Sequence, residues 1–406
     1  MNYKKNILFA ILFTFFYCLS ADMQAQTIRY VKPDATGDGS SWTNASGNIQ
    51  EMINLSANGD RIWIAGGNYP IAATLQMKNG VNVYGGFFGD ETNINDRPKS
   101  DLDTNGTVEA WEFTYSTVLD GQNERQVLNQ AANFTTVTTW DGVTITGGML
   151  SSTTASIYGC GVYLRTNGNL INSTITANGG SVQGDYGVYG GGIYSANGTV
   201  SHCSVSHNVG DGIYCDYNAQ NCTITHCIVE NNSGTGISSG NVSNSTVREN
   251  NGAGFAYSTA SNCLSLRNSG GGAYSGSYTN CSFIENTAET GGGLCGSIAK
   301  NCLILRNTAT HGGRAGEVRA TVPTSGSYTN CTFVDNTATE NGGGMDGGTA
   351  VNCIFWNNSA PLDMQVTGWS KITFSAIQGE GYLGTSIIVL SPINDKKQKR
   401  TLKTTT

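Results

Sequence analysis

One short unit recurs nine times along the chain, and it constrains the fold more than any other feature. Each copy has Cys or Ser at its second position, an apolar residue after it, and Asn five residues beyond that second position. The second positions are Ser173, Cys203, Cys227, Ser245, Cys263, Cys281, Cys302, Cys331 and Cys353. The matching asparagines are Asn178, Asn208, Asn232, Asn250, Asn268, Asn286, Asn307, Asn336 and Asn358.

Successive units start 18 to 30 residues apart, and each is followed by glycines and another apolar residue. Short β-type runs with this period, and without helical periodicity between them, are typical of a solenoid. Variable intervals with a constant strand register favour a parallel β-helix, because extra residues can leave the coil at its corners. We therefore predict an all-β parallel β-helix solenoid, with coils about 4.8 Å apart.

In such a solenoid, equivalent residues of successive coils stack into ladders. The asparagines are expected to share side-chain amide hydrogen bonds from coil to coil. We expect the glycines to supply the corners that need positive φ. A phosphate-binding loop is excluded, because no helix follows any of the glycine clusters.

The cysteines are interpreted as core residues. Ser173 and Ser245 replace Cys at the same repeat position, which favours small inward-facing side chains over disulfides. Coil-to-coil disulfides remain the alternative, because an exported protein can form them. His202 and His226 occupy equivalent positions and are expected to be polar turn residues that could stack.

The first 25 residues predict export. Lys4 and Lys5 precede an apolar run from residue 7 to residue 20, and small residues then offer cleavage sites, as in a signal peptide. Net charge −7 and a pI near 5.1 argue against nucleic acid as a partner. We expect a monomer that is not an integral membrane protein, located outside a bacterial cell or on its outer surface.

The remaining chain divides into three parts. Residues 26–135 lack the repeat and are predicted to form an N-terminal cap and the first coils. Ile49, Met52 and Ile53 lie on one face of a short helix expected in this cap, which would cover the open end of the solenoid. Residues 136–380 form the β-helix repeats, and residues 381–406 a final strand and a polar basic tail.

The segment "DLDTNGTVEAWE" matches the calcium-loop pattern D-x-[DN]-x-[DN]-G-x5-E. Asp101, Asp103 and Asn105 would supply side-chain oxygens, Thr107 its backbone carbonyl, and Glu112 a bidentate carboxylate. The flanking residues do not predict the two helices of a helix-loop-helix hand. We expect a structural Ca²⁺ site, with a polar surface turn as the alternative, and we assign no other cofactor.

A row of tyrosines is a candidate glycan-stacking surface. If Ile193, Ile213 and Ala273 point into the solenoid, the residues that follow them point outward on one sheet. These outward residues are Tyr194, Tyr214 and Tyr274. Exposed aromatic rings on a flat sheet suit sugar stacking. Isolated surface tyrosines are the alternative, because Ser238 and Ala256 interrupt the row.

Two families are similar to this sequence. The motifs "FIEN", "FVDN" and "FWNN", alternating with glycine clusters, resemble the FxxN and GGA[ILV] repeats of bacterial polymorphic outer-membrane proteins. The head, with "YVKPDATGDGSSW", "GDRIWIAGGNY" and "VYGGFFGDET", resembles secreted pectin-lyase-like β-helix proteins. These resemblances cover most of residues 27–380 and imply a right-handed β-helix, surface exposure and, for the first family, adhesion.

The sequence favours a secreted or cell-surface scaffold that binds or adheres, with an extracellular glycan or a host or cell-surface molecule as partner. The alternative is a polysaccharide lyase acting on an acidic polysaccharide. Arg248, Arg267 and Arg306 could line one face and supply its base, but any solvated ladder position would look the same. The insertions at residues 179–189 and 314–329 leave different corners, so they predict no common cleft, and we assign no catalytic residue.

Overall fold

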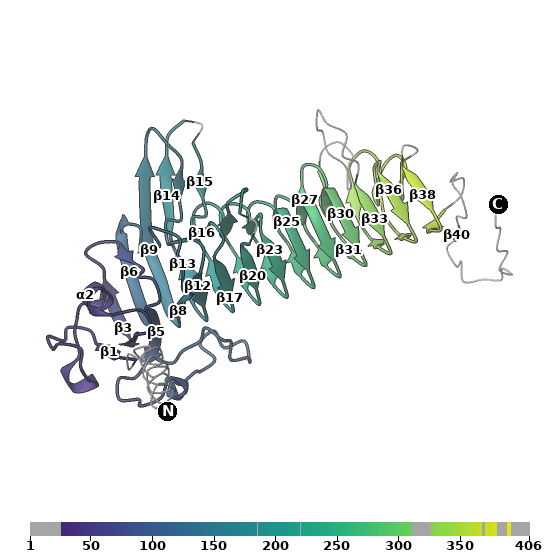
Figure 1. Cartoon of the computed structure of the whole chain (residues 1–406). Helices are drawn as coiled ribbons and strands as arrows, with labels where there is room; N and C mark the ends of the chain where they lie inside the picture. The colour runs from purple at the N-terminus through teal and green to yellow at the C-terminus, as the bar shows by residue number, and fades with distance from the viewer. Residues whose placement is uncertain are drawn as a thin grey trace, which may run out of the picture.

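The computed structural model describes residues 26–184, 186–219, 221–310, 326–367, 370–379 and 388–390. The expected signal peptide at 1–25, much of the insertion at 314–329 and most of the tail at 381–406 lie outside these ranges. The described chain forms one parallel β-helix whose coils stack from the N-terminal to the C-terminal end (Figure 1). No helix in the described ranges is long and apolar enough to cross a membrane.

Two long parallel sheets dominate the described residues, one of twenty strands (sheet A) and one of fifteen (sheet B). The strands of sheet A are β1 (Ile28–Val31), β2 (Arg61–Ala65), β4 (Leu75–Gln76), β5 (Asn82–Phe87), β7 (Leu128–Asn129), β8 (Thr138–Asp141), β11 (Val162–Leu164), β12 (Gly168–Ile171), β16 (Ile193–Ser195), β17 (Thr199–Ser201), β19 (Ile213–Cys215), β20 (Thr223–Thr225), β22 (Ile237–Ser238), β23 (Asn241–Ser243), β25 (Phe255–Ser261), β27 (Ala273–Thr279), β30 (Leu294–Lys300), β33 (Ser327–Thr329), β36 (Thr349–Val351) and β38 (Lys371–Thr373).

The strands of sheet B are β3 (Gly67–Pro70), β6 (Thr117–Arg125), β9 (Val143–Ser152), β13 (Thr174–Thr176), β14 (Gly179–Val182), β18 (Ser204–Ser206), β21 (Ile228–Glu230), β24 (Thr246–Arg248), β26 (Leu264–Leu266), β28 (Ser282–Ile284), β31 (Leu303–Leu305), β34 (Thr332–Val334), β37 (Ile354–Trp356), β39 (Ala376–Gln378) and β40 (Ile388–Leu390). A third side carries β29 (Thr287–Ala288), β32 (Thr308–Ala309) and β35 (Thr337–Ala338), and β10 (Ile157–Tyr158) pairs with β15 (Val188–Tyr189). The all-β parallel β-helix prediction is confirmed.

The cysteine position of the repeat faces the core, as predicted. All seven repeat cysteines are buried and unpaired, and Ser173 and Ser245 are buried at the same position. No coil-to-coil disulfide joins them in the described chain. A disulfide instead links Cys215 to Cys222 within one coil, seven residues apart.

The asparagine ladder is continuous. Each side-chain Nδ2 from Asn178 to Asn336 donates to Oδ1 of the asparagine in the next coil, at 2.9–3.1 Å. The backbone N–H of each also donates to that same oxygen. Asn358 continues the row to Gln365 at 2.8 Å. All nine asparagines are at most 3% exposed, so their polar groups are satisfied inside the solenoid.

The corners between sheets A and B differ from the prediction. In the nine repeat units the residue at this corner has positive φ, but it is Asn or His, not Gly, whereas Gly142 before β9 and Phe374 before β39 hold the same position in the flanking coils. The Asn and His residues are Asn172, His202, His226, Asn244, Asn262, Asn280, Asn301, Asn330 and Asn352. Asn and His are among the side chains that tolerate the left-handed region. The His202 and His226 rings stack with centroids 4.7 Å apart.

The glycine prediction holds where the chain turns back toward sheet A, since Gly190, Gly271, Gly291 and Gly342 have positive φ. Other repeat glycines leave room for the asparagine ladder. A Cβ added to Gly254, for example, would lie 2.8 Å from Nδ2 of Asn268 and 2.7 Å from the carbonyl oxygen of Gly272. Gly236 and Gly293 are equally close to the asparagines beside them. Only glycine leaves room for the ladder at this position.

The first coils carry a cap and an outer cover. Helix α2 (Ile49–Leu55) buries Ile49, Met52 and Ile53, as the sequence predicts. Residues 88–116 leave the coil between β5 and β6 and return to it, including the short helix η2 (Ile94–Asp96). We call this segment the covering loop. Its Arg97 lies over the rings of Phe87 and Phe113 and forms an ion pair of 3.1 Å with the buried Asp141.

Candidate functional site

A cluster of tyrosines covers the outside of sheet A near its middle. Register pairing aligns Tyr163 of β11, Tyr194 of β16 and Tyr214 of β19 in one column, because equivalent residues of stacked coils lie side by side. The ring of Tyr194 stacks on Tyr163 at 4.8 Å and on Tyr214 at 5.7 Å. Ile193 and Ile213, which precede two of these tyrosines, are fully buried in the core, as predicted.

Two further tyrosines reach this column from outside the repeat. Tyr158 of β10 and Tyr189 of β15 stack on each other at 5.5 Å. Tyr158 also packs edge-on against Tyr194 at 5.0 Å, and Tyr189 lies 5.0 Å from Tyr214. β15 belongs to the insertion at 179–189, which projects with β9 and β14 beyond the neighbouring coils (Figure 1). We call these five residues the tyrosine cluster.

Charged groups surround the tyrosine cluster. The Tyr194 hydroxyl donates to the Asp216 carboxylate at 2.5 Å. Burial is the largest cause that raises the pKa of Tyr194, and this bond to Asp216 is the second. The same bond lowers the pKa of Asp216. The Arg165 guanidinium lies 4.9 Å from the Tyr163 ring centroid, and its Nε is buried with no hydrogen-bond partner among the described residues. Aromatic faces therefore adjoin a carboxylate and a cation.

A second aromatic pair lies farther along the same sheet. Tyr274 is 39% exposed and packs edge-on against Tyr257 at 5.4 Å. Ser238 and Ala256 occupy the intervening rungs of the column, as the sequence indicated. Burial raises the pKa of Tyr257, with smaller contributions from Tyr274 and from Tyr217 of the disulfide loop.

The three predicted stacking residues have different fates. Tyr214 and Tyr274 lie outward with part of their surface free. The prediction is wrong for Tyr194, which is only 5% exposed because tyrosines cover both of its faces and one edge. The sequence missed Tyr158, Tyr163 and Tyr189. Tyr163 could have been found by extending the column one coil, whereas the other two lie outside the repeat pattern.

The predicted calcium loop is the tip of the covering loop. Its stem is antiparallel, with Lys99 bridged to Phe113 and a hydrogen bond of 3.1 Å from the Ser100 N–H to the Glu112 carbonyl. Carboxylate oxygens of Asp101, Asp103 and Glu112 lie within 4.8 Å of one another. The structure thus brings together three of the five predicted ligands.

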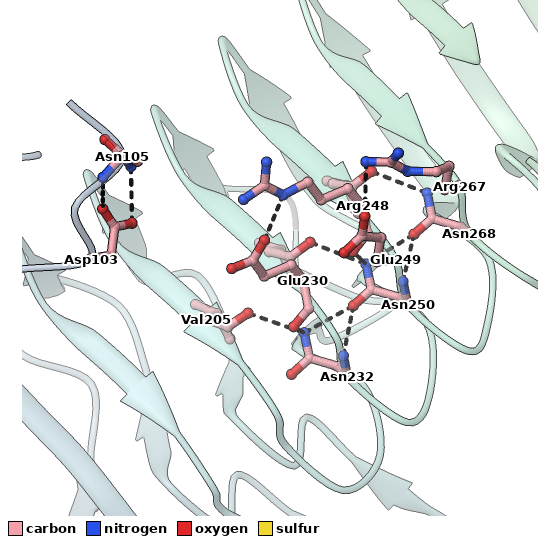
Figure 2. Close-up of polar contacts among 12 residues, drawn as sticks. Asp103, Asn105, Val205, Glu230, Asn232, Arg248, Glu249, Asn250, Arg267 and Asn268 are labelled. Carbon is pink, nitrogen blue, oxygen red and sulfur yellow. Dashed lines mark hydrogen bonds and ion pairs between the residues drawn. The ribbon is translucent and has the colours of Figure 1, made fainter. Parts of the chain in front are cut away.

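The side chain of Asn105 is oriented differently from the prediction. Asn105 donates its Nδ2 to Asp103 at 2.9 Å and to Glu109 at 3.1 Å, so its nitrogen and not its oxygen faces the carboxylates. Its Oδ1 accepts the backbone N–H of Thr107 at 2.8 Å. Coordination through Asn105 Oδ1 requires this side chain to turn over. Figure 2 shows the Asp103–Asn105 contact.

Glu109 adds a fourth carboxylate that the sequence analysis did not name. One of its oxygens, Oε2, is buried without a hydrogen-bond partner in the described chain. Burial first, and then the neighbouring Glu112, raise the pKa of Glu109. Burial also acts to raise the pKa of Glu112, but hydrogen bonds from Glu109, Leu102 and Asp103 outweigh it and lower that pKa. Glu109 is the ninth loop residue, a position that often ligates Ca²⁺ through water.

The arginines considered for a lyase are paired. Arg248 contacts Glu230, Arg267 contacts Glu249 at 2.9 Å, and Arg306 contacts Glu285 at 2.8 Å. In each pair the glutamate belongs to the preceding coil, and Figure 2 shows the first two pairs beside the asparagine ladder. Each of these arginines therefore has a carboxylate partner, and the pairs form a surface ladder of ion pairs.

An open depression of about 480 Å³ lies at the corner that follows sheet B. His207, Val209, Asn231 and Ser233 line it, and Glu249 supplies its only carboxylate among the described residues. Hydrolysis of a glycosidic bond needs two carboxyl groups on either side of that bond. The depression therefore lacks the arrangement of a glycosidase.

Comparison with known proteins agrees with this architecture. The protein family described as "Right handed beta helix region" matches residues 103–269. The chain is a right-handed parallel β-helix protein, and the handedness implied by the pectin-lyase-like resemblance is confirmed. No curated protein matches the chain. The link to polymorphic outer-membrane repeats rests on the quoted motifs alone.

Several solved structures are similar over most of the chain. Pectate lyase Pel9A is 14% identical, with 86% of this chain and 79% of that chain covered and a TM-score of 0.44. A rhamnogalacturonan lyase is 11% identical, with coverage of 86% and 87% and a TM-score of 0.41. The family 28 exopolygalacturonase of Yersinia enterocolitica is 12% identical, with coverage of 92% and 79% and a TM-score of 0.34. Similarity at this level says nothing about activity.

Proposed function

We propose that this protein is an exported, surface-acting β-helix scaffold that binds a glycan through the tyrosine cluster. The main observation in support of this proposal is that tyrosines from both the repeat and the insertion come together on one face of sheet A. Such packing orders the rings before a ligand arrives, so little conformational entropy is lost on binding. The N-terminal signal pattern supports export.

The accessible rings would make the contacts. Tyr158 is 41% exposed, and Tyr163, Tyr189 and Tyr214 are partly exposed around the buried Tyr194. Sugar rings carry apolar C–H faces that pack on aromatic rings, while their hydroxyls need polar partners. Arg165 and Asp216 stand at the cluster to supply such partners. In this assignment Tyr194 supports its neighbours and does not touch the glycan.

A binding assay with variants tests the proposal. The full-length protein is titrated with a panel of neutral and acidic polysaccharides, with affinity electrophoresis as the readout. Tyr158→Ala and Tyr214→Ala are each expected to weaken binding about 3- to 10-fold, the value of one aromatic contact. Tyr115→Ala is the matched control, because Tyr115 is 38% exposed but packs on Phe88 of the covering loop. Equal loss in all three variants, or no binding to any glycan, overturns the proposal.

The alternative function, a polysaccharide lyase, receives less support. Its base would be an arginine or lysine free to accept a proton next to a uronate. Arg248, Arg267 and Arg306 each have a glutamate from the preceding coil as partner. Incubation with uronate polysaccharides should therefore yield no unsaturated product. Absorbance from such a product would replace binding with lyase activity.

We also propose that the tip of the covering loop binds Ca²⁺ as a structural ion. Asp101, Asp103 and Glu112 supply the clustered carboxylates, and Glu109 adds a further one. Hard cations prefer oxygen ligands of this kind. Ca²⁺ at about 100 times its Kd would add about 2.7 kcal/mol to the free energy of unfolding, because the ion binds the folded chain and is released when the chain unfolds.

Thermal unfolding with Ca²⁺ and with a chelator tests the ion. We expect a higher Tm with Ca²⁺ for the natural chain and no difference for Asp103→Asn. Asp90→Asn, which changes an exposed acidic residue outside the loop tip, is the control and should keep the difference. A Tm that chelator leaves unchanged in the natural chain removes the calcium proposal and leaves the glycan proposal intact.

A further inference from the structure

The outer face of sheet B changes character along the solenoid. Strands β9 to β24 place mostly hydroxyl or charged side chains outward, in two columns formed by in-register pairing. The members are Thr144, Thr146, Thr174, Thr176, Ser204, Ser206, Ile228, Glu230, Thr246 and Arg248. From β26 to β37 eight of the ten positions in the same columns are apolar, and Ser282 and Thr332 are the other two.

Eight large apolar side chains occupy these later coils. They form what we call the apolar face: Leu264, Leu266, Ile284, Leu303, Leu305, Val334, Ile354 and Trp356. All eight retain exposed surface, and Ile354 is 45% exposed. None belongs to the buried core cluster, whereas Phe283, Ile304 and Phe355 between them do.

The described residues leave this apolar face partly exposed, which is unusual for a parallel sheet, because both of its faces are normally covered. The rungs from β26 to β39 span about 24 Å at ~4.8 Å each, and a three-residue strand with one corner residue on each side is about 17 Å wide, so the face with its flanking corners measures roughly 400 Å². Large patches of this kind usually mark an interaction surface. The area is about half of the ~800 Å² per partner of a standard protein interface, which is the size of a weak dimer interface.

Charges along one border of the apolar face indicate the occupant. The corner residues that follow its strands are Arg267, Glu285, Arg306, Asp335 and Asn357, and the first four alternate in charge from coil to coil. Arg267 and Arg306 have glutamate partners in the preceding coils. Asp335 accepts a hydrogen bond of 2.6 Å from Asn357 but forms no ion pair within the described chain. When two copies of such a column lie antiparallel and are offset by one coil, each charge faces a charge of opposite sign.

We propose that the apolar face binds a second copy of this chain in an antiparallel, twofold-symmetric dimer. The twofold axis runs along the strands between β31 and β34, so Leu305 packs on the partner's Val334 and Leu303 on the partner's Thr332, with the sheets about 10 Å apart. Arg306 then faces the partner's Asp335, and the symmetry makes this contact twice. The same axis places all six rungs from β26 to β39 in the interface. The tyrosine cluster lies on the outside of sheet A and stays free.

Sedimentation of the full-length protein over a range of concentrations tests the dimer. The natural chain is expected to dimerise, and Leu303→Glu/Leu305→Glu to raise the dimer Kd at least 100-fold. Thr174→Glu/Thr176→Glu is the matched control, with the same charges on the same sheet outside the apolar face, and it should still dimerise. If the first variant does not fold by circular dichroism, Leu305→Thr replaces it, with an expected increase in Kd of about tenfold.

A charge exchange distinguishes a second copy from any other occupant. Arg306→Asp and Asp335→Arg should each weaken the dimer about tenfold, and the variant with both changes should recover most of the loss. A monomer at every concentration overturns the proposal. A folded Leu303→Glu/Leu305→Glu dimer of natural affinity does the same, as does a monomeric chain whose apolar face binds phosphatidylcholine vesicles instead.

Discussion

The two ends of this solenoid are stabilised in different ways. In the first coils, the covering loop packs Arg97 and Phe113 over the outer face, and side chains with no repeat hold it there. In the later coils, buried asparagines repeat one hydrogen-bond pattern from coil to coil, and the described residues leave the outer face of sheet B partly exposed. Non-repeating packing closes one end of the fold. Repetition extends the other end but leaves surface for a partner.

Breaking the ladder should have the largest effect. Asn268 is fully buried, and its side chain joins Val247, Asn250 and Asn286. Asn268→Ala leaves several buried groups unsatisfied, so the free energy of unfolding should fall by about 4 kcal/mol or more. Urea unfolding measures it. Asn280→Ala, at an exposed corner between sheets A and B, is the control. An equal loss of stability in Asn280→Ala and Asn268→Ala would contradict the special role of the buried ladder.

Removing the anchor of the covering loop should cost somewhat less. Arg97→Ala leaves the buried Asp141 without its cation, and we expect a loss of about 3 kcal/mol in the free energy of unfolding. Arg306→Ala breaks an exposed pair of the later coils and should cost about 0–1 kcal/mol. Similar losses in urea unfolding of the two variants would erase the difference between the two ends.

A pH series compares the buried Asp141 of the first coils with the half-buried Asp211 of the repeats. Asp141 has Arg97 as partner, whereas burial raises the pKa of Asp211 from 3.8 to about 6. The folded state then binds a proton more tightly than the unfolded state does. The free energy of unfolding should therefore fall by about 1–3 kcal/mol as pH rises from about 4 to about 6. Asp211→Asn should reduce this pH-dependent loss of stability. If the variant keeps the pH profile of the natural chain, groups other than Asp211 cause the loss.

The smallest effect is expected on the apolar face. In dilute, monomeric protein, Leu305→Thr should change the free energy of unfolding by less than about 0.5 kcal/mol, because the side chain lies outside the core. Ile304→Thr on the same strand places a hydroxyl in the core and should cost about 2 kcal/mol or more. A large loss from Leu305→Thr in the monomer would mean that the face is already packed within one chain.

The repeat made much of the fold predictable. The spacing of Cys281 and Asn286 within a unit, and its recurrence, implied which residues stack and which face inward. The apolar face also had a signal, since "LSL" and "LIL" put leucine on both sides of an inward residue. The covered position of Tyr194 could not be predicted in this way. It depends on Tyr158 and Tyr189, which lie in segments without the period.

What the sequence by itself determined is the coil: its register, its asparagine ladder and its cysteine core. A parallel β-helix is nearly one-dimensional, so each unit contacts its neighbours in sequence order and a local pattern suffices. Only the tertiary structure decided where the non-repeating segments lie. The contact of Arg97 with Asp141, 44 residues away, and the approach of β15 to Tyr214 depend on how loops fold back over the coils. Packing between such segments has no period in the sequence.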